Sequence, residues 1–312
     1  MYHPYFRGKQ YELITIRENA ELISESGFTP IIEPVREALS GLDRALAALL
    51  EKDGRAIVIV NPHHGEHAGR GDGITALLQD QYAENASISP GILLKEQTTI
   101  EDALRCFALH ERANPTLIHA GFTEGVQLAD QLGRRVGEIR HIFLDDQSGR
   151  LYRRNFRSNQ QILVRDGFQK RRNKDHPPVE FFSDLHVTYE EEGMNGFGDY
   201  LTVGDDFSEG GGPAYAIAIH LTFIDSNNDD AMFVHHFLSE RQDTPTDPAG
   251  KFAEALRAMI IELDRPDSPV LETQAVQEFR ELHRKGHYPG LGYVKKLSMQ
   301  HHIETLADYL DR

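Results

Sequence analysis

The sequence has little cysteine, no long apolar run and a deficit of positive charge, and each scarcity excludes a class of protein. Its one cysteine, Cys106, cannot form an internal disulfide, and the lack of cysteine pairs excludes a thiolate zinc site. Its longest apolar runs, such as 56–60 and 215–219, are far shorter than the roughly 20 residues that a membrane span requires. The N-terminal residues contain no apolar stretch of the signal-peptide type. We therefore expect a cytoplasmic protein with no membrane association.

The charge balance argues against one common function. The 312 residues include 33 Lys+Arg and 49 Asp+Glu, which corresponds to a formal net charge of −16. Such a chain repels the phosphates of nucleic acid unless a local basic patch reverses the field, so we expect no direct non-specific nucleic-acid binding. Two dense basic stretches, 150–157 and 170–174, are either solvated faces or an anion-binding rim. The expected partner is an anionic small molecule or another protein, and an oligomer is compatible with both.

Short β-branched runs alternate with helix-type segments through the first half of the chain. The runs lie at 30–35, 56–60, 91–94, 116–119, 139–144 and 161–164, and the helix-type segments at 36–52, 74–85, 99–112 and 123–135. Strands this apolar, each followed by an amphipathic helix, indicate parallel strands that are covered on their outer face. No GxGxxG follows the first strand. The pattern therefore favours a closed (β/α)₈ barrel over an open doubly wound sheet.

The second half departs from this repeat. Strands are predicted at 197–203 and 214–223, but the loop between them is too short for a covering helix. Segments 219–224 and 232–237 flank the turn DSNNDD, which predicts an antiparallel hairpin.

The C-terminal part predicts helices, at 251–263, 271–285 and 298–310. The expected fold is α/β, a TIM-barrel-like (β/α)₈ architecture whose last units are modified by the hairpin. We expect one domain over 1–312, with 247–312 as a helical closure.

Ionisable side chains stand at the ends of several predicted strands, where a (β/α)₈ barrel places its functional residues. Glu33, Lys95 and His119 lie inside or directly beside an apolar run, and Asp145 follows the next one. A charge in such a position is costly to bury unless it is paired or used. We therefore expect Glu33, Lys95, His119 and Asp145 to form a catalytic group at one rim, with Arg165 and Asp205 binding ligand nearby.

Three interpretations of this rim remain open. Lys95 is a Schiff-base or proton-transfer lysine, or it neutralises Glu33 in a structural pair. Alternatively, a divalent cation such as Mg²⁺ is held by Glu33, by Asp145 or Asp146, and by Asp205, with Lys95 and Arg165 binding the anionic end of a substrate.

Other motifs carry weaker signals. The loop containing Gly210, Gly211 and Gly212 either lets backbone N–H groups converge on an anion or forms a flexible turn. The sequence HHGEH at 63–67 resembles a metal cluster, although neighbouring loop residues seldom face one ion. His235 and His236 lie in a predicted strand and point to opposite faces, so at most one can reach a given site.

The opening YHPYFRGKQYEL at 2–13, followed by TPIIEPV at 29–35, resembles a little-characterised bacterial and phage family typified by the "beta protein" of T-even phages. The segment FGDY at 197–200 and the predicted hairpin also look similar. The resemblance places Lys9 and Glu12 beside Glu33 and implies a TIM-barrel-like fold, but no activity. Some bacterial relatives lie beside nuclease-like genes, which suggests phage defence by association alone.

Two functional hypotheses follow. The first is a barrel that binds or acts on an anionic small molecule, for instance one that bears phosphate, at the C-terminal rim of its strands. The second is a non-catalytic scaffold or partner subunit, for instance of a nuclease in an anti-phage system, whose acidic surface docks a basic protein. The ionisable strand ends favour the first hypothesis, and the absence of a specific catalytic motif favours the second.

Overall fold

The computed structural model describes residues 1–208 and 214–312, and this chain divides into two compact units. The first, which we call the barrel unit, comprises Met1–Arg165 and Leu185–Asp199. The second, the hairpin unit, comprises Asp166–Asp184 and Tyr200–Arg312. The sequence-based assignment of one domain over 1–312 stays a prediction.

The barrel unit is built on a parallel sheet. Within the described residues it contains eight strands in the order β1 to β7 and then β9, each paired in parallel with its neighbour. Their bounds are β1 Tyr5–Phe6, β2 Ile31–Ile32, β3 Ala56–Ile59, β4 Ile88–Lys95, β5 Thr116–Ala120, β6 His141–Leu144, β7 Gln161–Val164 and β9 Gly196–Gly198. The predicted parallel pairing of the six apolar segments between residues 31 and 164 is confirmed.

The first and last strands of this sheet meet, so that the barrel is nearly closed. Tyr2 and Phe197 form a parallel bridge, and the backbone N–H of Tyr5 donates to the carbonyl of Asp199 at 2.8 Å. Gly198 permits this close approach, because a Cβ atom there would lie 2.2 Å from the carbonyl oxygen of His3. The expected TIM-barrel-like α/β fold is therefore confirmed.

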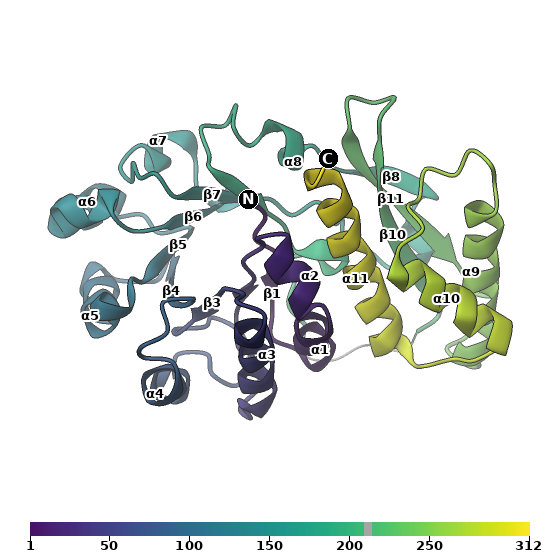
Figure 1. Ribbon diagram of the computed structural model, residues 1–312, viewed down its shortest axis with the longest axis horizontal. Helices are drawn as coiled ribbons and strands as arrows, with labels where there is room; N and C mark the ends of the chain where they lie inside the picture. Colours follow the sequence, from purple (N-terminus) through teal and green to yellow (C-terminus); the bar gives the residue numbers. More distant parts are fainter. Residues whose placement is uncertain (209–213) are drawn as a thin grey trace. The chain divides into compact units, whose positions relative to one another are not determined.

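Helices follow the strands and lie outside β3 to β7 in Figure 1. Their bounds are α1 Gln10–Glu18, α2 Ala20–Glu25, α3 Ser40–Glu51, α4 Asp72–Gln81, α5 Ile100–His110, α6 Gly125–Leu132, α7 Arg150–Arg153 and α8 Leu185–Thr188. The start of α5 shows the local cause, since the Thr99 hydroxyl accepts the Asp102 N–H and caps the helix. Because helices cover one face and the barrel interior the other, the strands are buried on both faces, as their unbroken apolar runs indicate.

The hairpin unit combines an antiparallel sheet with three long helices (Figure 1). Strands β10 (Ala218–Asp225) and β11 (Ala231–Leu238) pair in the predicted hairpin, with Ile219 opposite Phe237. The other edge of β11 pairs antiparallel with β8 (Val179–Ser183). Helices α9 (Pro248–Leu263), α10 (Gln274–Lys285) and α11 (Leu291–Leu310) pack an apolar core against this sheet. The three predicted C-terminal helices are present; that they close the barrel stays a prediction.

Three features of the sheets differ from the sequence-based expectation. The barrel begins with β1, and β8 is an additional strand; both lie in segments that carry no continuous apolar run. The strand predicted at 197–203 ends at Gly198, because Leu201 adopts a left-handed φ of 51° and starts a 3₁₀ turn, Leu201–Val203.

Within the described residues, no helix has both the length and the apolar content that a membrane span needs.

Candidate functional site

The side chain of Glu33, just beyond the end of β2, is fully buried and saturated with hydrogen bonds. Its Oε2 accepts from the Arg7 guanidinium and, at 3.1 Å, from the Tyr5 hydroxyl. Its Oε1 accepts the backbone N–H groups of His63 at 2.8 Å and His64 at 3.0 Å. A carboxylate offers about four lone-pair sites, so these donors leave none directed at a metal ion or a substrate.

The electrostatics of Glu33 follow from these contacts. Burial alone raises the pKa of this carboxyl, but the Arg7 charge, the nearby His64 and the two backbone donors outweigh burial and lower the pKa below its usual value. Glu33 is therefore held as an anion by its partners. Its cation is Arg7, from the end of β1, and not Lys95, so the interpretation of Lys95 as the structural partner of Glu33 is corrected.

The residues that the family resemblance places beside Glu33 belong to the same network. Glu12, on α1, is buried and accepts the backbone N–H of Arg7. Burial raises the pKa of Glu12, against the opposing effect of the Lys9 charge. The segment 7–12 thus joins β1 to α1 through two buried carboxylates that share Arg7.

Lys95 and Asp145 lie at the ends of β4 and β6, in the barrel unit, but each has its own partner. Lys95 Nζ donates to Gln147 Oε1 at 3.4 Å. Asp145 accepts from Arg153, and from Arg165 Nε at 2.7 Å. Asp145, Arg153 and Arg165 therefore form an ion-pair cluster. Asp145, a predicted cation ligand, and Arg165, a predicted anion-binding residue, are thus paired with each other.

His119 points away from this rim. In the parallel register Leu94 is opposite His119 and Lys95 is opposite Ala120, so His119 and Lys95 lie on different faces of the sheet. The His119 ring is fully buried, with Nδ1 2.7 Å from the Tyr152 hydroxyl and Nε2 3.0 Å from His141 Nδ1. This corrects the expected position of His119. Side chains alternate along a strand, and in this register His119 points to the same face as Leu94 and not to the face of Lys95.

The remaining predicted residues lie in the hairpin unit. The backbone N–H of Asp205 donates to Asp166 Oδ2 at 2.7 Å, which orders the start of the loop. Gly210, Gly211 and Gly212 lie outside the described residues. Asp205 belongs to a different unit from Glu33 and Asp145, and the predicted shared cation site stays a prediction.

The hairpin unit contains a cavity of about 650 Å³. Its described lining includes the side chains of Lys170, Arg171, Arg172, Lys174 and Lys295. The first four come from the basic stretch 170–174, which the sequence marked as a solvated face or an anion-binding rim. In a chain of net charge −16, this concentration of cations is the strongest electrostatic feature of the described cavity.

These cations differ in how far they are already neutralised. Arg171 pairs with Glu180 at 2.8 Å, and Arg172 pairs with Asp175 at 2.7 Å. Lys174 and Lys295 are exposed and have no ion pair among the described residues. They are the charges that an anion in the cavity can recruit without breaking an internal pair.

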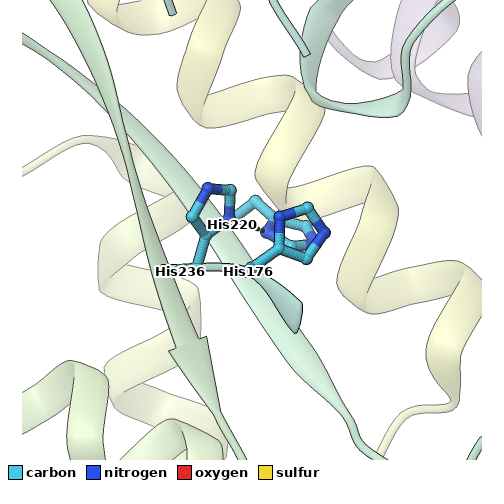
Figure 2. Close-up of side chains that lie close together, drawn as sticks. All are labelled: His176, His220 and His236. Atoms are coloured by element: carbon cyan, nitrogen blue, oxygen red, sulfur yellow. Dashed lines mark hydrogen bonds between the residues drawn. The ribbon is translucent and has the colours of Figure 1, made fainter. Parts of the chain in front are cut away.

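Three histidines, His176, His220 and His236, lie close together in the hairpin unit, as Figure 2 shows, and two of them, His176 and His220, line this cavity. His220 (β10) and His236 (β11) occupy directly opposite positions of the hairpin, with their Nδ1 atoms 2.7 Å apart. His176, from the segment before β8, stacks on the His236 ring at a centroid distance of 4.3 Å. Burial lowers the pKa of all three rings, that of His236 to about 4. All three are therefore neutral at pH 7, and each ring has one unprotonated nitrogen.

The sequence contained a signal for part of this cluster. The predicted pairing of 219–224 with 232–237 already places residue 220 opposite residue 236, so His220 and His236 share a face. Alternation along β11 then excludes His235, as expected. No sequence pattern indicated His176, because a loop brings it to the hairpin.

Comparisons of this chain with known protein families, with curated proteins and with solved structures find no match. The resemblance to the phage "beta protein" family stays a prediction.

Proposed function

We propose that this protein binds an anionic small molecule, phosphate-bearing or otherwise rich in negative charge, in the cavity of the hairpin unit. The observation that carries the proposal is the set of cationic side chains around a cavity of about 650 Å³, two of which, Lys174 and Lys295, have no ion pair among the described residues. A cavity of this volume is in the range of small-molecule sites, which span about 300–1,000 Å³. The ligand class is the one expected from the sequence, but the proposed site is the cavity and not the rim of the barrel strands.

The rim is the weaker candidate because its carboxylates Glu33 and Asp145 are already paired. Glu33 is saturated by its four donors, and Asp145 is held between two arginines. Binding an anion to Arg7 or a cation to Glu33 requires breaking a buried ion pair, which costs about 3–5 kcal/mol per unpaired charge. An anion in the cavity instead gains attraction from side chains that are exposed.

The experiment is a calorimetric titration of the full chain with inorganic phosphate and pyrophosphate, in low-salt buffer that contains a metal chelator. We expect binding that weakens as salt rises, and a loss of tenfold or more in affinity for the double variant Lys174→Ala, Lys295→Ala. Lys52→Ala, which changes a lysine outside the cavity lining, is the matched control and should bind like the wild type.

Two outcomes contradict the proposal. One is wild-type affinity for both anions in the Lys174, Lys295 double variant. The other is loss of binding in Lys95→Met with no loss in the double variant, which places the anion at the barrel rim.

A second candidate function is a non-catalytic scaffold, for instance a nuclease partner in an anti-phage system. The pairing of Glu33 and Asp145 favours it, because carboxylates that are used in internal ion pairs stabilise the fold and are not available for turnover. In a phage-protection assay, a scaffold should retain full protection with Lys95→Met and with the Lys174, Lys295 double variant. Loss of protection in either variant, with the fold intact, argues against it.

A further inference from the structure

The histidine cluster of the hairpin unit contains a buried ring nitrogen without a hydrogen-bond partner in the described part of the chain. His176, His220 and His236 each present one ring nitrogen within 4.8 Å of the others. The Nδ1 atom of His176, which is 94% buried as a residue, lies 3.5 Å from Glu180 Oε1 and has no hydrogen-bond partner of normal length among the described residues. Buried polar atoms normally have a partner, so an unsatisfied imidazole beside two others is unusual for a core.

The hydrogen bonds around His236 determine which of its nitrogens is available. Its Nε2 lies 2.9 Å from Glu180 Oε1, and a carboxylate can only accept, so the ring proton is on Nε2. The lone pair is then on Nδ1, where it accepts a hydrogen bond from the Nδ1–H of His220, 2.7 Å away. A metal ion bound by both Nδ1 atoms takes the place of this proton, which moves to His220 Nε2. Glu180 therefore orients His236 as a carboxylate orients a metal-bound histidine through the other ring nitrogen.

The fold holds these rings in place. His220 and His236 are paired residues on neighbouring strands, so their Cβ atoms lie on the same face of the hairpin. In a tetrahedral site with metal–nitrogen distances of about 2.0–2.1 Å, ligand nitrogens lie about 3.3 Å apart. The two Nδ1 atoms must separate by about 0.6 Å from their present 2.7 Å, and the His176 nitrogen must approach, which ring rotations can supply.

We propose that His176, His220 and His236 form a binding site for a divalent transition metal, with Zn²⁺ the best fit to three imidazole ligands. Glu180 is a positioning residue that hydrogen-bonds His236. Because His176 and His220 also line the cavity, the fourth coordination position opens into it, as in zinc sites that keep one position for water or an anion. Neutral imidazoles suit this role, since a proton and a metal compete for the same lone pair.

This site does not depend on the proposed function. A metal can bind whether or not the cavity lysines bind an anion, and the titration with phosphate is performed with chelator present. Failure of either proposal is therefore visible separately. If both proposals hold, the metal and the cationic side chains contact the same anion in the cavity.

The test uses the untagged, metal-free full chain and Co²⁺ as a spectroscopic probe, with Zn²⁺ as a competitor. We expect one equivalent of Co²⁺ with the intense visible bands of a four-coordinate site, displaced by one equivalent of Zn²⁺. His220→Gln and His236→Gln should abolish these bands. His235→Gln is the matched control, because it changes the adjacent residue on the opposite face of β11 and should leave the bands unchanged.

A positioning variant keeps the test informative if a histidine variant does not fold. Glu180→Gln leaves the three histidines unchanged but removes the carboxylate charge that faces His236 Nε2–H, and it should weaken Zn²⁺ binding by about 10- to 100-fold, the usual effect of changing an outer partner of a metal ligand. Zn²⁺ should also raise the melting temperature of the wild type but not of His236→Gln. The proposal is overturned if Co²⁺ gives no four-coordinate spectrum. It is equally overturned if the spectrum persists in folded His220→Gln and His236→Gln, which would place the metal elsewhere, for example at the loop 63–67.

Discussion

Replacing Glu33 by Gln removes the anion from the most extensively paired buried carboxylate of the barrel unit. Glu33 is 0% exposed and its partner Arg7 is 7% exposed, so the variant leaves a buried guanidinium without its counter-charge. Breaking a buried pair from one side costs about 3–5 kcal/mol. The new side-chain NH₂ group also faces two donors, either the backbone N–H groups of His63 and His64 or the Tyr5 hydroxyl and the Arg7 guanidinium, and this repulsion lies within the same range.

Urea denaturation followed by far-ultraviolet circular dichroism and tyrosine fluorescence measures this loss; the chain has 11 tyrosines and no tryptophan. For an m value of about 2 kcal/mol/M, the midpoint should fall by about 1.5–2.5 M. Arg7→Met should cost a similar amount, and Arg7→Met with Glu33→Gln should cost less than the sum of the two, because neither charge is then left alone.

The matched control is Lys52→Gln, which breaks the exposed pair between Lys52 and Glu21 and should leave the midpoint unchanged. A loss below about 1 kcal/mol for Glu33→Gln would refute the argument that Glu33 is a buried, fully used structural anion. Additive losses in the cycle would show that Arg7 and Glu33 do not stabilise each other.

Two further predictions concern the stability of the barrel unit. Gly65→Ala should destabilise the protein by about 1–3 kcal/mol more than Gly69→Ala. Both residues have a positive φ, but a Cβ at Gly65 would lie 2.2 Å from the Val35 carbonyl oxygen, whereas nothing lies within 4 Å of a Cβ at Gly69. Equal urea midpoints for the two variants would contradict this packing difference. Stability should also fall as pH drops from about 6.5 to 4, because burial lowers the pKa of His3 to about 3 and that of His141 to about 4, so the unfolded chain binds protons that the folded chain rejects. Urea midpoints between pH 7 and pH 4 measure this loss. His141→Gln should reduce the fall by up to about 3 kcal/mol at pH 4, and a flat profile in the wild type would be the contrary result.

The order and direction of the barrel strands could be predicted from the sequence. Runs such as 56–60 and 91–94 are apolar throughout, and only a strand buried on both faces, as in a parallel sheet covered by helices, needs that composition. The hairpin and its register could also be predicted, because a polar turn between two apolar, alternating segments leaves little freedom in how the two strands pair. From that register the juxtaposition of His220 and His236 also follows.

The tertiary structure decided which charges meet. The sequence places Glu33 and Lys95 at strand ends, but β1 is the parallel neighbour of β2, so Arg7 reaches Glu33 first. A two-residue strand such as β1 leaves no pattern that a sequence reading can detect. His119 is buried against Tyr152, because the alternation of β5 turns it to the other face of the sheet.

The same limit applies to the histidine cluster. His176 reaches the hairpin because β8 pairs with β11, and β8 carries exposed Val179 and Phe181 in place of the apolar run that marks a buried strand. The local sequence pattern shows which residues are buried and with what period, and this predicts the helices and strands. The partner of a buried charge or of a single imidazole depends on which segments, distant in sequence, pack together, and that is set by the whole fold.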